Sequence, residues 1–218
     1  MGIPMIRSFL LMLLVSCTLA GPVAGQSTAF SLSDVQAAYD ALDGLRASFT
    51  QVVGSDFAAD STQVEGSVLL SGNKYRVQTP AQTVVTDGNT TWIYTPADSQ
   101  VVVNRADTEG AVTPETFLTA SEERYKVTAS AETTRRGTPH RTLALTSTDS
   151  AARFAEATLW VRTSDRVVTR MRAADRNGST LDLRLRDIVV NPDALRADAP
   201  FTFAAPPGVE VVDLRRSE

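Results

Sequence analysis

The sequence has almost no side chains suited to thiol, redox or metal chemistry. It contains one cysteine, Cys17, and one histidine, His140, in 218 residues. A Ser-His-Asp triad needs a histidine oriented by a carboxylate, together with a nucleophile motif, and no such motif accompanies His140. Because His140 follows Pro139, we expect an exposed turn residue. A chain without further Cys or His offers no disulfide and no Cys/His metal site.

Lysine is equally scarce, and the charge is mildly acidic. Lys74 and Lys126 are the only lysines, and the formal net charge is −4. This balance argues against a nucleic-acid surface. No calcium loop, dinucleotide-binding turn or phosphate loop is present, so we expect no cofactor and no enzyme. Scattered carboxylates leave a glycoside hydrolase open in principle, although no motif supports one.

The arginines form the one notable charge pattern. Five of them fall on predicted hairpin strands, partly at alternate positions, and most simply mark a solvated sheet face. A partner-binding role for this face is the alternative. These arginines are Arg162, Arg166, Arg170, Arg172 and Arg176.

The N-terminus is predicted to be a signal peptide over residues 1–25, leaving 26–218 as a single domain. Arg7 precedes an apolar run at 8–20, and small residues lead to a cleavage site before Gln26. The run is shorter than the roughly 20 residues that span a bilayer. Residues 14–17, "LVSC", also fit a lipobox, so lipid attachment at Cys17 is the less favoured alternative.

Two segments have helical patterns. Residues 31–51 carry one apolar stripe at three- and four-residue steps, which predicts a helix. Residues 113–125 begin with Thr-Pro-Glu, as helix N-termini often do, and predict a short helix or lid. The stripe of the first helix consists of Val35, Ala38, Leu42, Leu45 and Phe49.

The rest of the chain alternates with a period of two and predicts about 10–11 antiparallel strands in a mainly β (α+β) fold. So many consecutive hairpins must curl into a barrel, a sandwich or a strongly bent open sheet. Paired aromatic and apolar residues fill a core or line an acyl-chain cavity. The strands are predicted within 64–79, at 82–86, 90–95, 100–105, 125–131, 140–147, 156–162, 167–175 and 179–190, with a closing segment at 201–214.

Five ordered stretches resemble the LolA family of periplasmic carriers for outer-membrane lipoproteins. The most specific is Asp-Gly-x-x-x-Trp-x-Tyr at 87–94, followed by a Gln-Val run. The resemblance covers essentially the whole mature chain, with only hairpin rhythm between 130 and 175. The stretches are "LRASFTQ" (45–51), "EGSVLLSGNKYRVQTP" (65–80), "VVTDGNTTWIYTPADSQVVV" (84–103), "TPETFLTASEERYKV" (113–127) and "FTFAAPPGVEVVD" (201–213).

The resemblance implies an unclosed antiparallel β-barrel with helices as a lid over an apolar cavity. Such a carrier is a periplasmic monomer that takes acylated lipoproteins from an inner-membrane ABC-type releasing complex to the outer membrane, to an acceptor if one is present. The expected cavity residues are Tyr75, Val77, Trp92, Tyr94, Trp160 and Leu183. The expected lid residues are Leu42, Leu45, Phe49, Phe117 and Leu118.

One position departs from the family pattern. The family carries a lid-holding arginine in the turn after the "EG" strand, whereas residues 71–74 here read Ser-Gly-Asn-Lys. Lys74 cannot reproduce a planar guanidinium fork. Two related alternatives stay open: a LolB-like outer-membrane acceptor lipidated at Cys17, and a lipid-sensing regulatory domain of the same fold.

Overall fold

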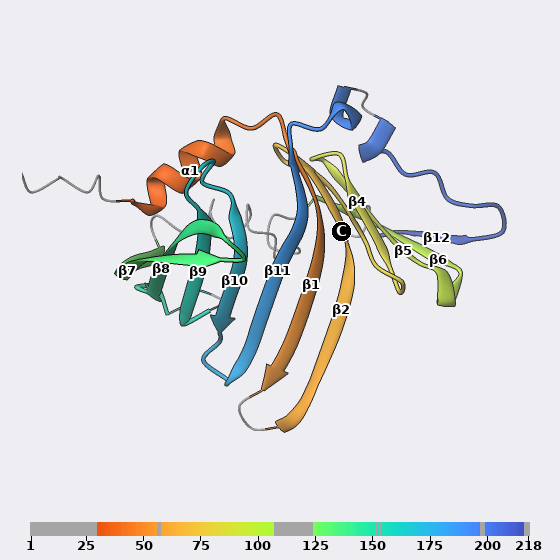
Figure 1. Ribbon diagram of the computed structural model, residues 1–218. Coiled ribbons are helices and arrows are strands. Elements are labelled where there is room, and N and C mark those ends of the chain that lie inside the picture. The colour runs from red at the N-terminus through yellow and green to blue at the C-terminus, as the bar shows by residue number, and fades with distance from the viewer. Residues whose placement is uncertain are drawn as a thin grey trace, which may run out of the picture.

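The computed structural model describes residues 30–55, 58–106, 124–150, 152, 154–196 and 199–215 (Figure 1). The predicted signal peptide and nearly all of the segment 113–125 lie outside these ranges. One sheet of twelve strands holds the described chain, in the order β12-β6-β5-β4-β3-β2-β1-β11-β10-β9-β8-β7. The strands are β1 (Leu45–Ser55), β2 (Ala58–Ser71), β3 (Lys74–Gln78), β4 (Thr83–Thr86), β5 (Thr90–Thr95), β6 (Gln100–Arg105), β7 (Tyr125–Arg135), β8 (Thr138–Ser147), β9 (Glu156–Arg162), β10 (Val168–Ala174), β11 (Ser179–Val190) and β12 (Glu210–Asp213). The helices are α1 (Leu32–Asp40) and three short 3₁₀ turns, η1 (Pro96–Asp98), η2 (Asp193–Arg196) and η3 (Ala199–Phe201).

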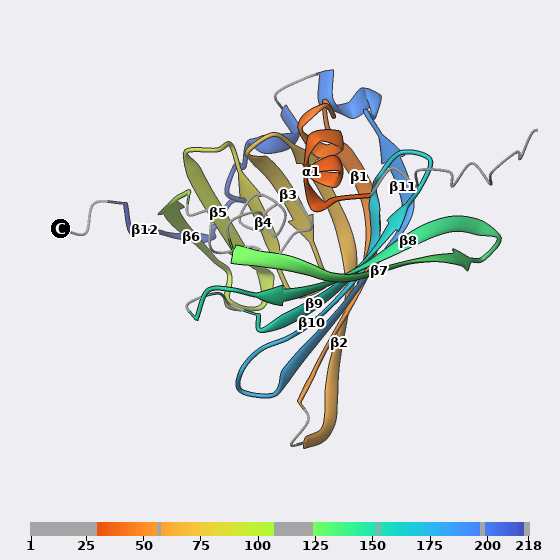
Figure 2. The same ribbon diagram turned by 90° about the vertical axis from the view of Figure 1, so that its left-hand side faces the viewer.

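The sheet is strongly curved and does not close, because β12 and β7 stand at its two ends. Viewed from the β7 side, α1 lies inside the curve (Figure 2). We call the face that α1 covers the concave face and the opposite one the outer face. Neighbouring strands pair antiparallel, except that β12 pairs parallel with β6. The prediction of a mainly β, unclosed antiparallel sheet is confirmed, with twelve strands in place of 10–11.

Helix α1 is shorter than the sequence predicted. A capping box starts it: Ser31 Oγ accepts from the Asp34 amide at 3.1 Å, and the Ser31 amide donates to Asp34 Oδ2 at 2.9 Å. The helix ends at Asp40, so the predicted extent to residue 51 is wrong. A Cβ at Gly44 would lie 2.1 Å from the Leu70 carbonyl oxygen, so only glycine permits this approach of the chain to β2.

The core lies between α1 and the concave face of β1, β2 and β8–β11. The Tyr39 hydroxyl anchors the helix by accepting a 3.1 Å hydrogen bond from the Val168 amide. Fully buried side chains on the sheet include Leu45, Leu143, Leu159 and Met171. This half of the concave face is therefore filled by the protein's own side chains.

The C-terminal segment covers the outer face of the other half. Arg76 on β3 donates from Nε to the Pro200 carbonyl at 2.6 Å and from Nη2 to the Thr202 carbonyl at 2.9 Å. The Phe203 ring lies 5.7 Å from the Tyr94 ring, centroid to centroid. After this crossing the chain adds β12 beside β6 (Figure 1). Strands β3–β6 thus have apolar side chains on both faces.

Candidate functional site

An apolar strip runs across the concave face of β3–β6. The unbroken register places Val77 opposite Val68 and Val84, Ile93 opposite Val84 and Val102, and Tyr75 beside them on the same face. Cross-strand partners share a face of a sheet. We define the apolar strip as Tyr75, Val77, Val84, Ile93 and Val102.

The apolar strip differs from the core in exposure. Every member of the strip is only partly buried by the described residues. On the same face of β8–β10, Leu143, Leu159 and Met171 are fully buried. Exposed apolar surface confined to one region of a sheet is typical of a binding face. The strip is therefore the best candidate for an apolar ligand.

Three of the six predicted cavity residues lie on the concave face. Tyr75 and Val77 belong to the apolar strip. Leu183 is on β11, where it pairs with Met171 and Gln51, and only 5% of its surface is exposed. Leu183 is thus part of the filled core, at a distance of several strands from the strip.

The other three, Trp92, Tyr94 and Trp160, are on the outer face, so their prediction as cavity residues is wrong. Trp92 pairs with Val85 and Val103, which alternate with the strip residues, and Tyr94 contacts Phe203 of the C-terminal segment. Both aromatics help to seal the outer face. Their neighbour Ile93 was missed, although its place between two outer-face aromatics puts it on the concave face.

Trp160 stands in a charged setting. It pairs with Arg170 and Thr142, and the guanidinium of Arg170 lies 4.5 Å from the centroid of its ring. The Arg135 guanidinium lies 5.4 Å from the same ring. Leu159 and Val161, on either side of Trp160 in β9, point into the core. Period-two alternation therefore turns Trp160 away from any apolar cavity.

The predicted lid residues separate into three groups. Leu42 follows α1 in a loop and packs, partly buried, against the core. Leu45 and Phe49 are buried on β1, so their assignment to a lid helix is wrong. Phe117 and Leu118 lie outside the described residues.

The family's arginine position falls in the β2–β3 hairpin, where Gly72 has φ +54°. The Asn73 side chain occupies the space beside Gly88, since a Cβ there would lie 2.4 Å from Asn73 Nδ2. In this protein the β2–β3 turn therefore packs on the β4–β5 turn through an amide. The nearby Arg76 is directed to the outer face instead, as described above.

The most strongly perturbed carboxyl is Asp182 on the outer face of β11. Arg170 donates to it from Nε at 2.9 Å and from Nη2 at 2.5 Å, and Arg184 from Nε at 3.2 Å and Nη2 at 2.9 Å. Burial opposes its ionisation, but these hydrogen bonds outweigh that effect and lower the pKa of Asp182 to about 2. Asp182 is thus a fixed anion and not a proton carrier at neutral pH.

His140 is not an exposed turn residue, so that prediction is wrong. It pairs with Thr133 and Arg162 in the sheet and is 5% exposed. Its Nδ1 lies 2.8 Å from the Thr138 carbonyl oxygen. Among the described residues, no three His, Cys, Asp or Glu side chains gather as metal ligands. In the same ranges, no helix combines the length and apolarity needed to cross a bilayer.

Comparison with known proteins gives consistent matches over most of the chain. The family model of the outer membrane lipoprotein carrier protein LolA matches residues 40–204. An outer-membrane lipoprotein carrier protein of Chromohalobacter salexigens is 27% identical over 211 residues, 94% of this chain and 98% of that protein. Its counterpart in Photorhabdus laumondii is 25% identical over 214 residues, with the same coverage of both chains.

Among solved structures, an uncharacterized conserved protein from Thermus thermophilus superposes with a TM-score of 0.56 at 13% identity. The match covers 84% of this chain and 96% of that one. At this identity the likeness concerns the fold alone.

Proposed function

Since the chain belongs to the LolA family of outer membrane lipoprotein carrier proteins, we propose that it carries lipoproteins by covering their acyl chains with the apolar strip. Members of this family are carriers and not enzymes. The half-exposed strip on β3–β6, beside a core that is otherwise filled, is the observation that supports the proposal.

The physical task is to shield hydrocarbon from water reversibly. Burial of each methylene is worth about 0.8 kcal/mol, so an exposed acyl chain aggregates or enters a nearby bilayer. A preformed wall of Tyr75, Val77, Val84, Ile93 and Val102 replaces water without a cost for unfolding a packed core. Because the strip is open at one end of the sheet, cargo can also leave it.

A second wall is needed over the strip. The chain between Ala106 and Arg124 joins β6, in the strip, to β7 at the far edge of the sheet. We assign Phe117 and Leu118 of this connection to the cover. Helix α1 is a poor candidate for a moving lid, because Val35 is fully buried and Tyr39 is hydrogen-bonded to β10.

The place of action follows from the predicted signal peptide. Cleavage before Gln26 would release a carrier into the periplasm, where it receives acylated lipoproteins from an inner-membrane ABC-type releasing complex and delivers them to the outer membrane. Lipidation at Cys17 would instead make a LolB-like anchored acceptor. Mass spectrometry of the mature N-terminus distinguishes the two, through Gln26 or an acylated cysteine.

Co-purification tests the carrier function. The protein is isolated from the periplasm of cells that express it, and the bound material is analysed by mass spectrometry. We expect triacylated lipoproteins with the native protein and fewer with Ile93→Asp, which places a charge in the apolar strip. Ser67 on the outer face supplies the control, Ser67→Asp. Equal recovery from native protein and Ile93→Asp contradicts the proposal.

A further inference from the structure

The outer face of the sheet from β7 to β2 gathers positive charge on a chain whose net charge is negative. The register places eight cationic side chains and three carboxylates on it, within the described strands. We call this surface the arginine face. Its cations are Arg46, Lys126, Arg135, Arg162, Arg170, Arg172, Arg184 and Arg186, and its carboxylates are Glu65, Glu156 and Asp182.

One carboxylate serves three arginines at the centre of this face. Asp182 forms the paired hydrogen bonds with Arg170 and Arg184 already described, and Arg172 Nε lies 4.0 Å from its Oδ2. The Arg172 and Arg184 side chains are 61% and 51% exposed. The cluster is ordered by its anion, yet keeps excess positive charge in contact with solvent.

Neighbouring residues extend the cluster. Arg186, 49% exposed, donates to Thr50 Oγ1 at 2.6 Å and lies 3.7 Å from Glu65. On the other side Trp160 is flanked by Arg170 and Arg135, within cation–π range of both. These contacts fix the direction of the guanidinium groups. A preorganised fork loses less conformational entropy when it binds an anion.

We propose that the arginine face binds the phosphate headgroups of an anionic phospholipid bilayer. Guanidinium forks match phosphate geometry. The cations spread over neighbouring strands on the outside of the curve and not into a cleft, which suits an extended charged plane better than a single small anion. The inference goes beyond the proposed function: it concerns how the protein meets a membrane, on the face opposite the apolar strip.

Vesicle co-sedimentation tests the proposal with the mature, cargo-free protein. We expect binding to phosphatidylcholine vesicles that contain phosphatidylglycerol, weaker binding in high salt, and little binding to phosphatidylcholine alone. Each cation near an anionic surface multiplies the partition coefficient by roughly five, so R172S/R184S should lower it roughly thirty-fold. Both side chains are exposed by half or more, and Arg170 still neutralises Asp182 in this variant.

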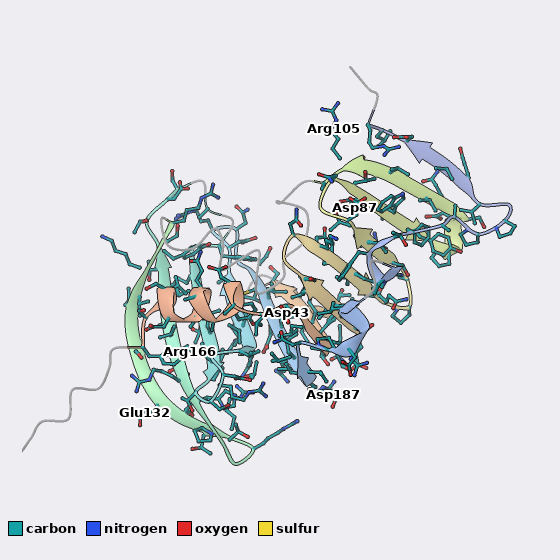
Figure 3. The ribbon with its side chains drawn as sticks, turned by 90° about the horizontal axis from the view of Figure 1, so that it is seen from above. Asp43, Asp87, Arg105, Glu132, Arg166 and Asp187 are labelled. Carbon is teal, nitrogen blue, oxygen red and sulfur yellow. The ribbon has the colours of Figure 1, made fainter. Side chains whose placement is uncertain are left out.

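The matched control removes two exposed arginines elsewhere. Arg105 lies near the β6 end of the sheet, and Arg166 lies near α1 (Figure 3). R105S/R166N should bind the vesicles as the native protein does, with asparagine chosen because residue 166 has φ +58°. An equal loss in both double variants overturns the proposal, because it indicates net charge and not this face.

Two other results also overturn it. One is equal binding to vesicles with and without phosphatidylglycerol; the other is no binding to either at low salt, which leaves an acidic protein as the partner of this face. Lipoprotein capture is measured on the same variants. Since R172S/R184S leaves the apolar strip intact, loss of vesicle binding with normal capture separates this inference from the carrier function.

Discussion

The Phe49 ring on β1 lies directly over Gly66, its cross-strand partner on β2. A Cβ at position 66 would come within 2.8 Å of Phe49 Cζ and 2.2 Å of the Gln78 carbonyl oxygen. The glycine therefore lets a buried aromatic ring pack flat on the sheet and lets β3 approach β2. This contact lies where the filled core meets the apolar strip.

Gly66→Ala should destabilise the fold by about 1–3 kcal/mol, as expected for overpacking. The added methyl cannot avoid the Gln78 carbonyl without moving β2 or β3. Urea unfolding measures the change. The adjacent Ser67→Ala, on the outer face, is the control and should stay within about 0.5 kcal/mol of the native protein. A neutral Gly66→Ala would show that the contact with β3 yields easily.

Tyr39→Phe should cost about 1–3 kcal/mol, because it leaves the buried Val168 amide without its hydrogen-bond acceptor. The loss should be seen by hydrogen exchange as faster exchange of the Val168 amide. Unchanged exchange at Val168 would mean that the Tyr39 hydroxyl does not hold α1 on the sheet.

Arg76→Lys should loosen the C-terminal segment, since lysine cannot donate to the Pro200 and Thr202 carbonyls as a planar fork. We expect a loss of about 1–2 kcal/mol and faster proteolysis within 202–209. Arg105→Lys is the matched control, with the same chemical change at an exposed position. Identical proteolysis of the two variants would contradict a clamping role for Arg76.

Asp182 should make stability depend on pH below 4. Its pKa is lowered from 3.8 to about 2, so its stabilising contribution is complete above pH 4 and is lost as the pH falls towards 2. Asp182→Asn should lower stability at pH 7 by about 1–2 kcal/mol, because solvent partly screens the cluster. The two stability curves should converge near pH 2. A constant difference between pH 7 and pH 2 would contradict this.

Much of the fold could be predicted because the hairpins obey simple rules. Asp87-Gly88 and the turn at 96–99 separate short apolar runs, and β4, β5 and β6 follow them closely. The wet and dry alternation of β11 was equally clear, from Ser179 to Val190.

The helix boundary failed for a physical reason. Leu45 and Phe49 are four residues apart, which suits a helical stripe, but Leu45, Ala47 and Phe49 also alternate as a strand. The close approach of Gly44 to Leu70 decides between the two, and it is a tertiary contact that no local pattern contains.

The faces of β4–β6 failed because they carry no polarity contrast. Trp92, Ile93 and Tyr94 are all apolar or aromatic, and the outer face is covered by a segment more than a hundred residues later in the chain. His140 failed differently: Pro139 was interpreted as part of a turn, although proline is tolerated near the start of a strand.

Site-specific photo-cross-linking tests the central claim most directly. Benzoylphenylalanine is placed singly at Val77 or Ile93 in the apolar strip, and at Trp92 or Tyr94 on the outer face, and each protein is irradiated with a triacylated lipoprotein. We predict cross-links to the acyl chains from residues 77 and 93 and none from 92 and 94. Cross-links from 92 and 94 alone, or from none of the four, would contradict the carrier account.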